Sequence, residues 1–266
     1  MSTRETLERP EGRLAYTTYG PADGELVVAA HGMGDTGAVY SVLATDLAAA
    51  GYRVAVLDLR GHGDSDLTFD DYDDEALASD LVALLEKLGP GHVAGNSMGA
   101  GAAVIAAAHR PDLVRKLVLI GPFARNPKVN PLLVTAMRVA MLRPFGPLAW
   151  KAYLKTAYPS RYPADHVDAL LTGLRRPGRW RAFYRTTRTS HAPAEAALPG
   201  VRAESLVVMG TRDPDWPDPT AEAQWLRDGL DARLVLVEGA GHYPHFEFPE
   251  VVSPAVLAFL KDTPVA

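Results

Sequence analysis

The chain has 266 residues, 47% hydrophobic and 22% charged, so it can bury a substantial core as an ordinary globular protein does. The absence of cysteine excludes disulfides and thiolate chemistry and fits a cytoplasmic location, and the net charge of −5 argues against nucleic acid as a partner. No apolar run approaches the roughly 20 residues of a spanning helix, and the charged N-terminus does not resemble a signal peptide, so we expect no membrane partner.

Six short, β-rich and mostly apolar segments predict buried strands. They are ELVVAAHG (25–32), YRVAVLDLRG (52–61), HVAGNS (92–97), KLVLIGP (116–122), SLVVMGT (205–211) and RLVLVEGAG (233–241). Helical patterns lie between and after them, at about 38–50, 73–88, 98–109, 219–229 and 250–261. Gly51 and Gly89 stand where helix C-caps are expected. This alternation predicts an α/β fold with a doubly wound, parallel sheet.

The segment 123–200 interrupts the alternation. It has helical patterns punctuated by prolines and no clear strand. Its ten Arg and three Lys outnumber its three acidic residues, whereas the rest of the chain is acidic. We therefore divide the chain into a core of residues 1–122 and 201–266 and a helical cap of residues 123–200.

The stretch GNSMG (95–99) lies where the third predicted strand meets a helix. In such a sheet, chemistry takes place at the carboxyl ends of the strands. The pattern G-x-S-x-G at this place predicts a nucleophile elbow, a sharp turn that exposes the hydroxyl of Ser97. Glycines at 95 and 99 allow strand and helix to approach closely, and the helix N-terminus favours a developing anion. Ser97 is the predicted nucleophile.

A serine hydroxyl needs a base to become a nucleophile, and the base needs an acid to orient it. His242 follows the last predicted strand and is the predicted base, with His245 as the alternative. The loop TRDPDWPDP after the preceding strand supplies Asp213 as the predicted acid, with Asp215 as the alternative. The order Ser97, Asp213, His242 is the order that this triad takes on such sheets.

Acyl transfer also needs donors for the oxyanion that develops on the carbonyl oxygen. The loop in AAHGMGDTG (29–37) follows the first predicted strand and offers the backbone N–H of Met33. Met98, directly after the predicted nucleophile, offers the second backbone N–H. His31 in the same loop is expected to be structural.

Five motifs resemble the successive signatures of the α/β-hydrolase family. They are HGMGD, DLRGHGDSD (58–66), GNSMGA, GTRDPDW and GAGHYPHFEFPE, and they follow the family's order and spacing over essentially the whole chain. The resemblance implies an eight-stranded, mostly parallel sheet with a helical lid inserted after strand six, which matches 123–200. It also implies a triad of Ser97, His242 and Asp213, with no metal ion and no organic cofactor. Serine as nucleophile argues against the aspartate-dependent epoxide hydrolases and haloalkane dehalogenases.

The predicted function is hydrolysis of a carboxylic ester or related acyl bond in a small-molecule substrate, through an acyl-enzyme. An asparagine before the nucleophile, here Asn96, resembles the carbon–carbon bond hydrolases of ring-cleavage pathways, which also have Asn at this position. Those enzymes carry Trp where this chain has Tyr243. A thioesterase that serves carrier proteins is another alternative. A ligand receptor with residual hydrolysis is the alternative from a different class.

The segment RRPGRWRAFYRTTR (175–188) places six arginines around three aromatic side chains. Arginine binds carboxylates bidentately, so one interpretation is a site for an anionic substrate group. The simpler interpretation is an amphipathic helix that turns Trp180, Phe183 and Tyr184 toward the pocket or core and its arginines toward water.

Overall fold

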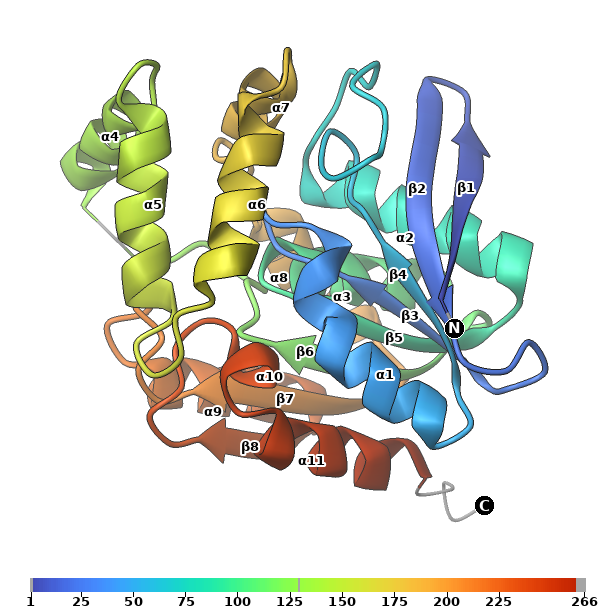
Figure 1. Ribbon diagram of the computed structural model, residues 1–266. Helices are drawn as coiled ribbons and strands as arrows, with labels where there is room; N and C mark the ends of the chain where they lie inside the picture. The colour runs from blue at the N-terminus through green and yellow to red at the C-terminus, as the bar shows by residue number, and fades with distance from the viewer. Residues whose placement is uncertain (1, 129, 262–266) are drawn as a thin grey trace.

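The computed structural model describes residues 2–128 and 130–261, with helices on both faces of one central sheet (Figure 1). The sheet has eight strands in the order β1-β2-β4-β3-β5-β6-β7-β8. They are β1 (Thr3–Arg9), β2 (Gly12–Tyr19), β3 (Leu26–Ala30), β4 (Arg53–Leu57), β5 (Gly91–Asn96), β6 (Val114–Ile120), β7 (Glu204–Gly210) and β8 (Arg233–Val237). β2 is antiparallel to both β1 and β4, and all other neighbours are parallel. This confirms the predicted fold class.

The residue pattern predicted six of these strands and missed the hairpin of β1 and β2. β1 forms one edge of the sheet, and Leu7 is its one buried residue. An edge strand that faces water needs no apolar run, so its sequence, TRETLER, carries little strand signal. The count of eight strands came from the family resemblance alone.

The helices of the core follow the predicted ranges to within a few residues. They are η1 (Gly37–Tyr40), α1 (Ser41–Ala49), α2 (Asp74–Leu88), α3 (Met98–His109), α9 (Pro219–Leu230) and α11 (Pro249–Lys261). The short α10 (Pro244–Glu247) was not predicted. At the start of α2 the side chain of Asp73 accepts a hydrogen bond from the N–H of Ala76, and Gly89, with φ 106°, ends the helix. Such local caps explain why the sequence located this helix closely.

The two faces of the sheet pack against different helices. Val28 of β3 belongs to an apolar cluster that includes α2, α3 and α9. Its neighbour Val27 belongs to a second cluster, with α1 and α11, because successive strand residues point to opposite faces. The second cluster continues beyond the sheet to Trp150 and Phe183, which follow β6 in the chain.

Helices occupy the segment between β6 and β7. They are α4 (Pro131–Ala140), α5 (Gly146–Ala157), α6 (Ala164–Arg175), α7 (Arg179–Thr186), α8 (Ala192–Ala197) and η2 (Leu198–Gly200). Figure 1 shows α4, α5, α6 and α7 standing together to one side of the sheet, whereas α8 packs against α3. The described residues of this segment include no strand, as its sequence predicted.

No helix within the described ranges combines the length and the apolar character that crossing a bilayer requires.

Two glycines are required where β5 meets α3. A Cβ on Gly95 would lie 2.4 Å from the carbonyl oxygen of Gly99, and a Cβ on Gly99 would lie 2.4 Å from that of Ala30. Real Cβ atoms do not approach backbone this closely, so strand, helix and the end of β3 leave no room for a side chain.

Gly95→Ala and Gly99→Ala are therefore each expected to lower the free energy of unfolding by about 3 kcal/mol or to prevent folding. Gly173→Ala is the matched control, since Gly173 lies inside α6 and a Cβ there meets nothing within 4 Å. That change is expected to raise stability by up to about 1 kcal/mol. The urea concentration at the midpoint of unfolding measures the stability of all three variants. A midpoint for Gly95→Ala equal to that of wild type would contradict the close approach of β5 and α3.

Candidate active site

Ser97 joins β5 to α3 in a conformation that residues with a side chain rarely adopt. Its φ is 57° and its ψ −123°, and Asp231 is the one other non-glycine residue with positive φ among those described. The turn is held from both sides: the N–H of Ser97 donates to Ile120 O at 3.0 Å, and its carbonyl accepts from Ala100 N–H at 3.0 Å. Strain that neighbouring hydrogen bonds maintain is typical of reactive positions.

Little space surrounds the hydroxyl of Ser97. A Cβ on Gly32 would lie 3.1 Å from Ser97 Oγ, so the loop after β3 passes directly beside it. A Cβ on Gly34 in the same loop would lie 2.5 Å from the ring of Phe183 and 2.7 Å from that of Trp150. Ser97 itself is only 4% exposed, so little of this residue contacts solvent.

His242 lies between two carboxylates. Its Nδ1 is 2.8 Å from Asp213 Oδ2 and 3.2 Å from Asp215 Oδ2. The backbone N–H of Asp215 also donates to Asp213 Oδ1 at 3.0 Å, which orients the first carboxylate. Both acids that the sequence left open therefore contact the same imidazole, with Asp213 nearer and more deeply buried.

Asp215 receives its own partner from the helices between β6 and β7. The hydroxyl of Tyr153, on α5, donates to Asp215 Oδ2 at 2.8 Å. Burial raises the pKa of Asp215 to about 6, although His242 and the Tyr153 hydroxyl both favour the carboxylate. Tyr153 carried no sequence signal for this role, because it lies about 60 residues before its partner.

The two carboxylates control the charge of His242. Burial by itself would lower the pKa of His242, but Asp213 and Asp215 outweigh it and raise that pKa to about 9. A general base must be neutral to accept a proton. On the sequence prediction that His242 is the base of an ester hydrolase, we expect kcat/KM for ester hydrolysis to rise about tenfold per pH unit up to about pH 9. Initial rates at subsaturating substrate between about pH 6 and pH 10 measure this. A profile already level at neutral pH would contradict the raised pKa.

Three hydrogen bonds hold the loop that carries His242. Asn96, directly before Ser97, donates from Nδ2 to the carbonyl of His242 at 3.2 Å, which joins the loop to the elbow. The N–H of His242 donates to Ala157 O at the end of α5. The buried carboxylate of Glu247 accepts from the N–H of Gly241 at 2.6 Å. These contacts fix the backbone that carries the imidazole.

His245, the alternative base, belongs to the core. Its ring lies 4.8 Å from that of Tyr40, centroid to centroid. Neither of its ring nitrogens has a hydrogen-bond partner among the described residues. Burial lowers the pKa of His245 to about 3, so this imidazole stays neutral and serves as packing.

In the loop after β3, Met33 is among the residues whose backbone N–H donates to no described residue. The N–H groups of Gly34, Asp35 and Thr36 all donate within the protein. By contrast, the N–H groups of Met33 and Met98 donate to none of the described residues. Met33 follows Gly32, which lies against Ser97, and Met98 is the first residue of α3, so both belong to the surroundings of the hydroxyl.

Two buried histidines fix this loop. His31 donates from Nδ1 to Gly32 O at 2.7 Å and accepts at Nε2 from the N–H of Leu59, so it has the structural role that was expected. His62 accepts at Nε2 from the N–H of Gly34 at 3.0 Å. Burial lowers the pKa of His62 to about 3, which keeps Nε2 free to accept. The sequence did not predict this role for His62, although it stands within the DLRGHGDSD motif.

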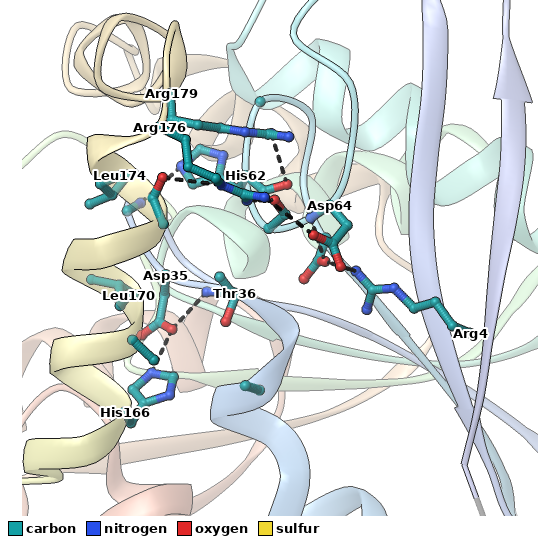
Figure 2. A pocket seen from close by; sticks show the side chains of 17 residues that line it. Arg4, Asp35, Thr36, His62, Asp64, His166, Leu170, Leu174, Arg176 and Arg179 are labelled. Carbon is teal, nitrogen blue, oxygen red and sulfur yellow. Dashed lines mark hydrogen bonds and ion pairs between the residues drawn. The ribbon is translucent and has the colours of Figure 1, made fainter.

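A cavity of about 300 Å³ lies where α6 meets the loops after β3 and β4 (Figure 2). Its lining includes Asp35 and His166, which form an ion pair of 2.8 Å between the loop and α6. Arg176 and Arg179 also line it, but neither Ser97 nor His242 does.

The arginines of 175–188 connect two parts of the chain. Arg176 donates to Gly63 O, Arg179 to Ser65 O and Arg185 to Asp70 O, so all three bind carbonyls of the loop after β4. Trp180 and Phe183 are buried, as the amphipathic interpretation expected. Arg176 and Arg185 remain exposed, as that interpretation expected, whereas Arg179 is partly buried. All three also donate to carbonyls of this loop, a contact that the sequence did not predict.

One group of side chains has metal-ligand geometry within the described ranges. Ligand atoms of Asp213, Asp215 and His242 lie within 4.8 Å of one another. The same imidazole nitrogen contacts both carboxylates, so a bound cation would compete with the proton that joins them.

The sequence model of the alpha/beta hydrolase family matches residues 27–255 of this chain. The chain is 30% identical to 2-(acetamidomethylene)succinate hydrolase of Mesorhizobium japonicum, over 94% of this chain and 92% of that protein. It is 28% identical to the sn-1-specific diacylglycerol lipase ABHD11 of Mus musculus, over 95% and 88% respectively. The enol-lactonase structure from Burkholderia xenovorans superposes with a TM-score of 0.83 at 22% identity, covering 97% of this chain and 100% of that one. By fold and by sequence, the chain belongs to the alpha/beta hydrolase family.

Proposed function

We propose that the protein is a serine hydrolase that cleaves a carboxylic ester through an acyl-enzyme on Ser97. One observation carries the proposal: an imidazole paired with the buried carboxylate of Asp213 is joined, through Asn96, to a serine in a strained strand-to-helix turn. Nucleophile, base and orienting acid are the parts that acyl transfer by serine requires. We further propose that residues 123–200 act as a cap over this site.

In the proposed reaction, Ser97 Oγ attacks the carbonyl carbon while His242 Nε2 removes the hydroxyl proton. The N–H groups of Met33 and Met98 hold the oxygen that becomes negative, because they have no partner among the described residues. His242 then gives its proton to the leaving alcohol, and the acyl group stays on Ser97. Water, deprotonated by His242, attacks the acyl carbon. The bond between that carbon and Ser97 Oγ breaks, His242 gives its proton to Ser97 Oγ, and the acid is released.

The aromatic side chains near His242 favour a substrate with an apolar portion. The ring of Phe123 lies 5.8 Å from that of His242, and Trp216 lies 5.1 Å from Phe123.

Asn96, the residue that resembles the carbon–carbon bond hydrolases, is accounted for here by its hydrogen bond to the His242 loop. An ester is therefore preferred, and thioesters are its nearest chemical alternative because they form the same acyl-enzyme.

The acyl-enzyme is the species to detect. On mixing with p-nitrophenyl butyrate, wild type is expected to release a burst of about one p-nitrophenol per chain, and mass spectrometry to find the butyryl group on the peptide containing Ser97. Deacylation measured in the same experiment separates the enzyme from the receptor alternative, which predicts one acylation followed by very slow release. An adduct on any other residue would overturn the proposal.

A further inference from the structure

Exposed apolar side chains gather at one end of the cap. Ten large hydrophobic residues are exposed among those described, and seven of them lie between residues 132 and 148. We call these seven the cap-tip patch, and each is between 47% and 79% exposed: Leu132, Leu133, Met137, Val139, Leu142, Phe145 and Leu148. An apolar concentration of this kind on a water-facing surface marks a binding surface.

The described part of the chain does not cover this patch. Of residues 132–140, only Val134 is partly buried, so α4 contributes little to the core. Figure 1 shows α4 on the outer side of α5, away from the sheet. At 100° per residue, the patch residues of α4 fall within an arc of about 160°, with Arg138 on the opposite side. α4 is therefore amphipathic, but its apolar side faces outward.

The chain segment that carries the patch has charged residues of one sign only. Residues 121–164 contain seven basic residues and no Asp or Glu, although the whole chain has a net charge of −5. Lys128, Arg138 and Arg143 are exposed, and none of the described acidic residues forms an ion pair with them. Apolar side chains on a segment that also exposes basic residues match a surface with an apolar interior and a negatively charged exterior.

We propose that the cap-tip patch binds the surface of an anionic lipid bilayer, with α4 lying in the interface. Amphipathic helices with basic borders bind such surfaces by inserting their apolar side between headgroups. We prefer a lipid surface to a protein partner because the segment combines an aliphatic and aromatic patch with basic side chains and has no acidic one, which matches apolar lipid chains beneath anionic headgroups. The expectation of no membrane partner concerned spanning helices, and lying on a surface needs only one apolar side.

The test uses the full chain with Ser97→Ala, so that binding is measured without hydrolysis. Cosedimentation measures how much protein the vesicles bind. Vesicles of phosphatidylcholine with about 30% phosphatidylglycerol should bind at least about tenfold more protein than vesicles of phosphatidylcholine alone, and the amount bound should fall at high salt. Adding Phe145→Asp and Leu148→Asp should lower binding at least about tenfold. Val251→Asp is the matched control, since Val251 is exposed on α11, far from the patch, and should leave binding unchanged.

Several results would overturn the proposal. The protein could fail to bind anionic vesicles, or Val251→Asp could lower binding as much as Phe145→Asp with Leu148→Asp does. Light scattering could also find a dimer that Phe145→Asp with Leu148→Asp dissociates. The last would show that a second copy of the chain covers the patch. Thermal unfolding of each variant verifies its fold. Because no step depends on catalysis, failure here leaves the proposed hydrolase function standing, and the reverse also holds.

Discussion

Replacing Ser97 with alanine is expected to lower kcat for p-nitrophenyl ester hydrolysis by about 10⁴- to 10⁶-fold. The change removes the attacking oxygen but leaves the oxyanion donors and the binding site, so a small residual rate over water remains. Steady-state rates over a series of acyl-chain lengths measure the loss. Ser79→Ala, on the exposed surface of α2, serves as control and should keep wild-type activity. Equal rates for Ser97→Ala and wild type would eliminate Ser97 as the nucleophile.

The same position offers a stability test that separates strain from chemistry. Alanine at 97 keeps the positive φ of 57° and its cost, whereas glycine adopts such values freely. Ser97→Gly is therefore expected to be about 1 kcal/mol more stable than Ser97→Ala, although both are inactive. If the two variants unfolded at the same urea concentration, the turn would not be strained.

Removing both carboxylates beside His242 is expected to cost far more than removing either one. In Asp213→Asn, Asp215 can still accept from Nδ1, so we expect kcat/KM to fall about 10²- to 10³-fold. In the double variant with Asp215→Asn, no carboxylate fixes the ring or stabilises the imidazolium, and the fall should reach about 10⁴-fold or more.

The control for this pair lies in the same loop. Asp218 caps α9 by accepting from the N–H of Ala221, so Asp218→Asn should affect stability slightly and activity hardly at all. Asp215→Asn alone should also move the pH–rate profile toward lower pH, because one of the charges that raise the pKa of His242 is lost. If Asp213→Asn were as inactive as the double variant, Asp215 would not orient His242 or stabilise its imidazolium.

The parts of the site that the sequence predicted are those whose signals are local. The elbow needs a strand, small residues at 95 and 99, and a helix start, and all of these stand within one short stretch. The same holds for the loops that carry Asp213 and His242, which directly follow apolar strands. Their assignment as triad members stays a prediction until the variants above are measured.

The parts that the sequence did not predict depend on contacts between distant segments. Glu247 reads as an ordinary acidic residue near a helix start, yet its buried carboxylate binds the loop of His242. Tyr153 reads as a helix residue of the cap, yet its hydroxyl reaches Asp215. Neither residue type nor spacing predicts such pairs, because glutamate and tyrosine side chains are usually solvent-exposed or packed in the core.

By itself, then, the amino-acid sequence determined the alternation of strands and helices, the predicted nucleophile and the loops in which its partners stand, since backbone preference and apolar periodicity act over a few residues. Only the tertiary structure decided that two carboxylates share one imidazole, that arginines of 175–188 bind carbonyls of the loop after β4, and that the apolar side of α4 faces outward. Those outcomes follow from packing between the sheet and the helices that follow β6, where burial and unmet hydrogen bonds select partners that lie far apart along the chain.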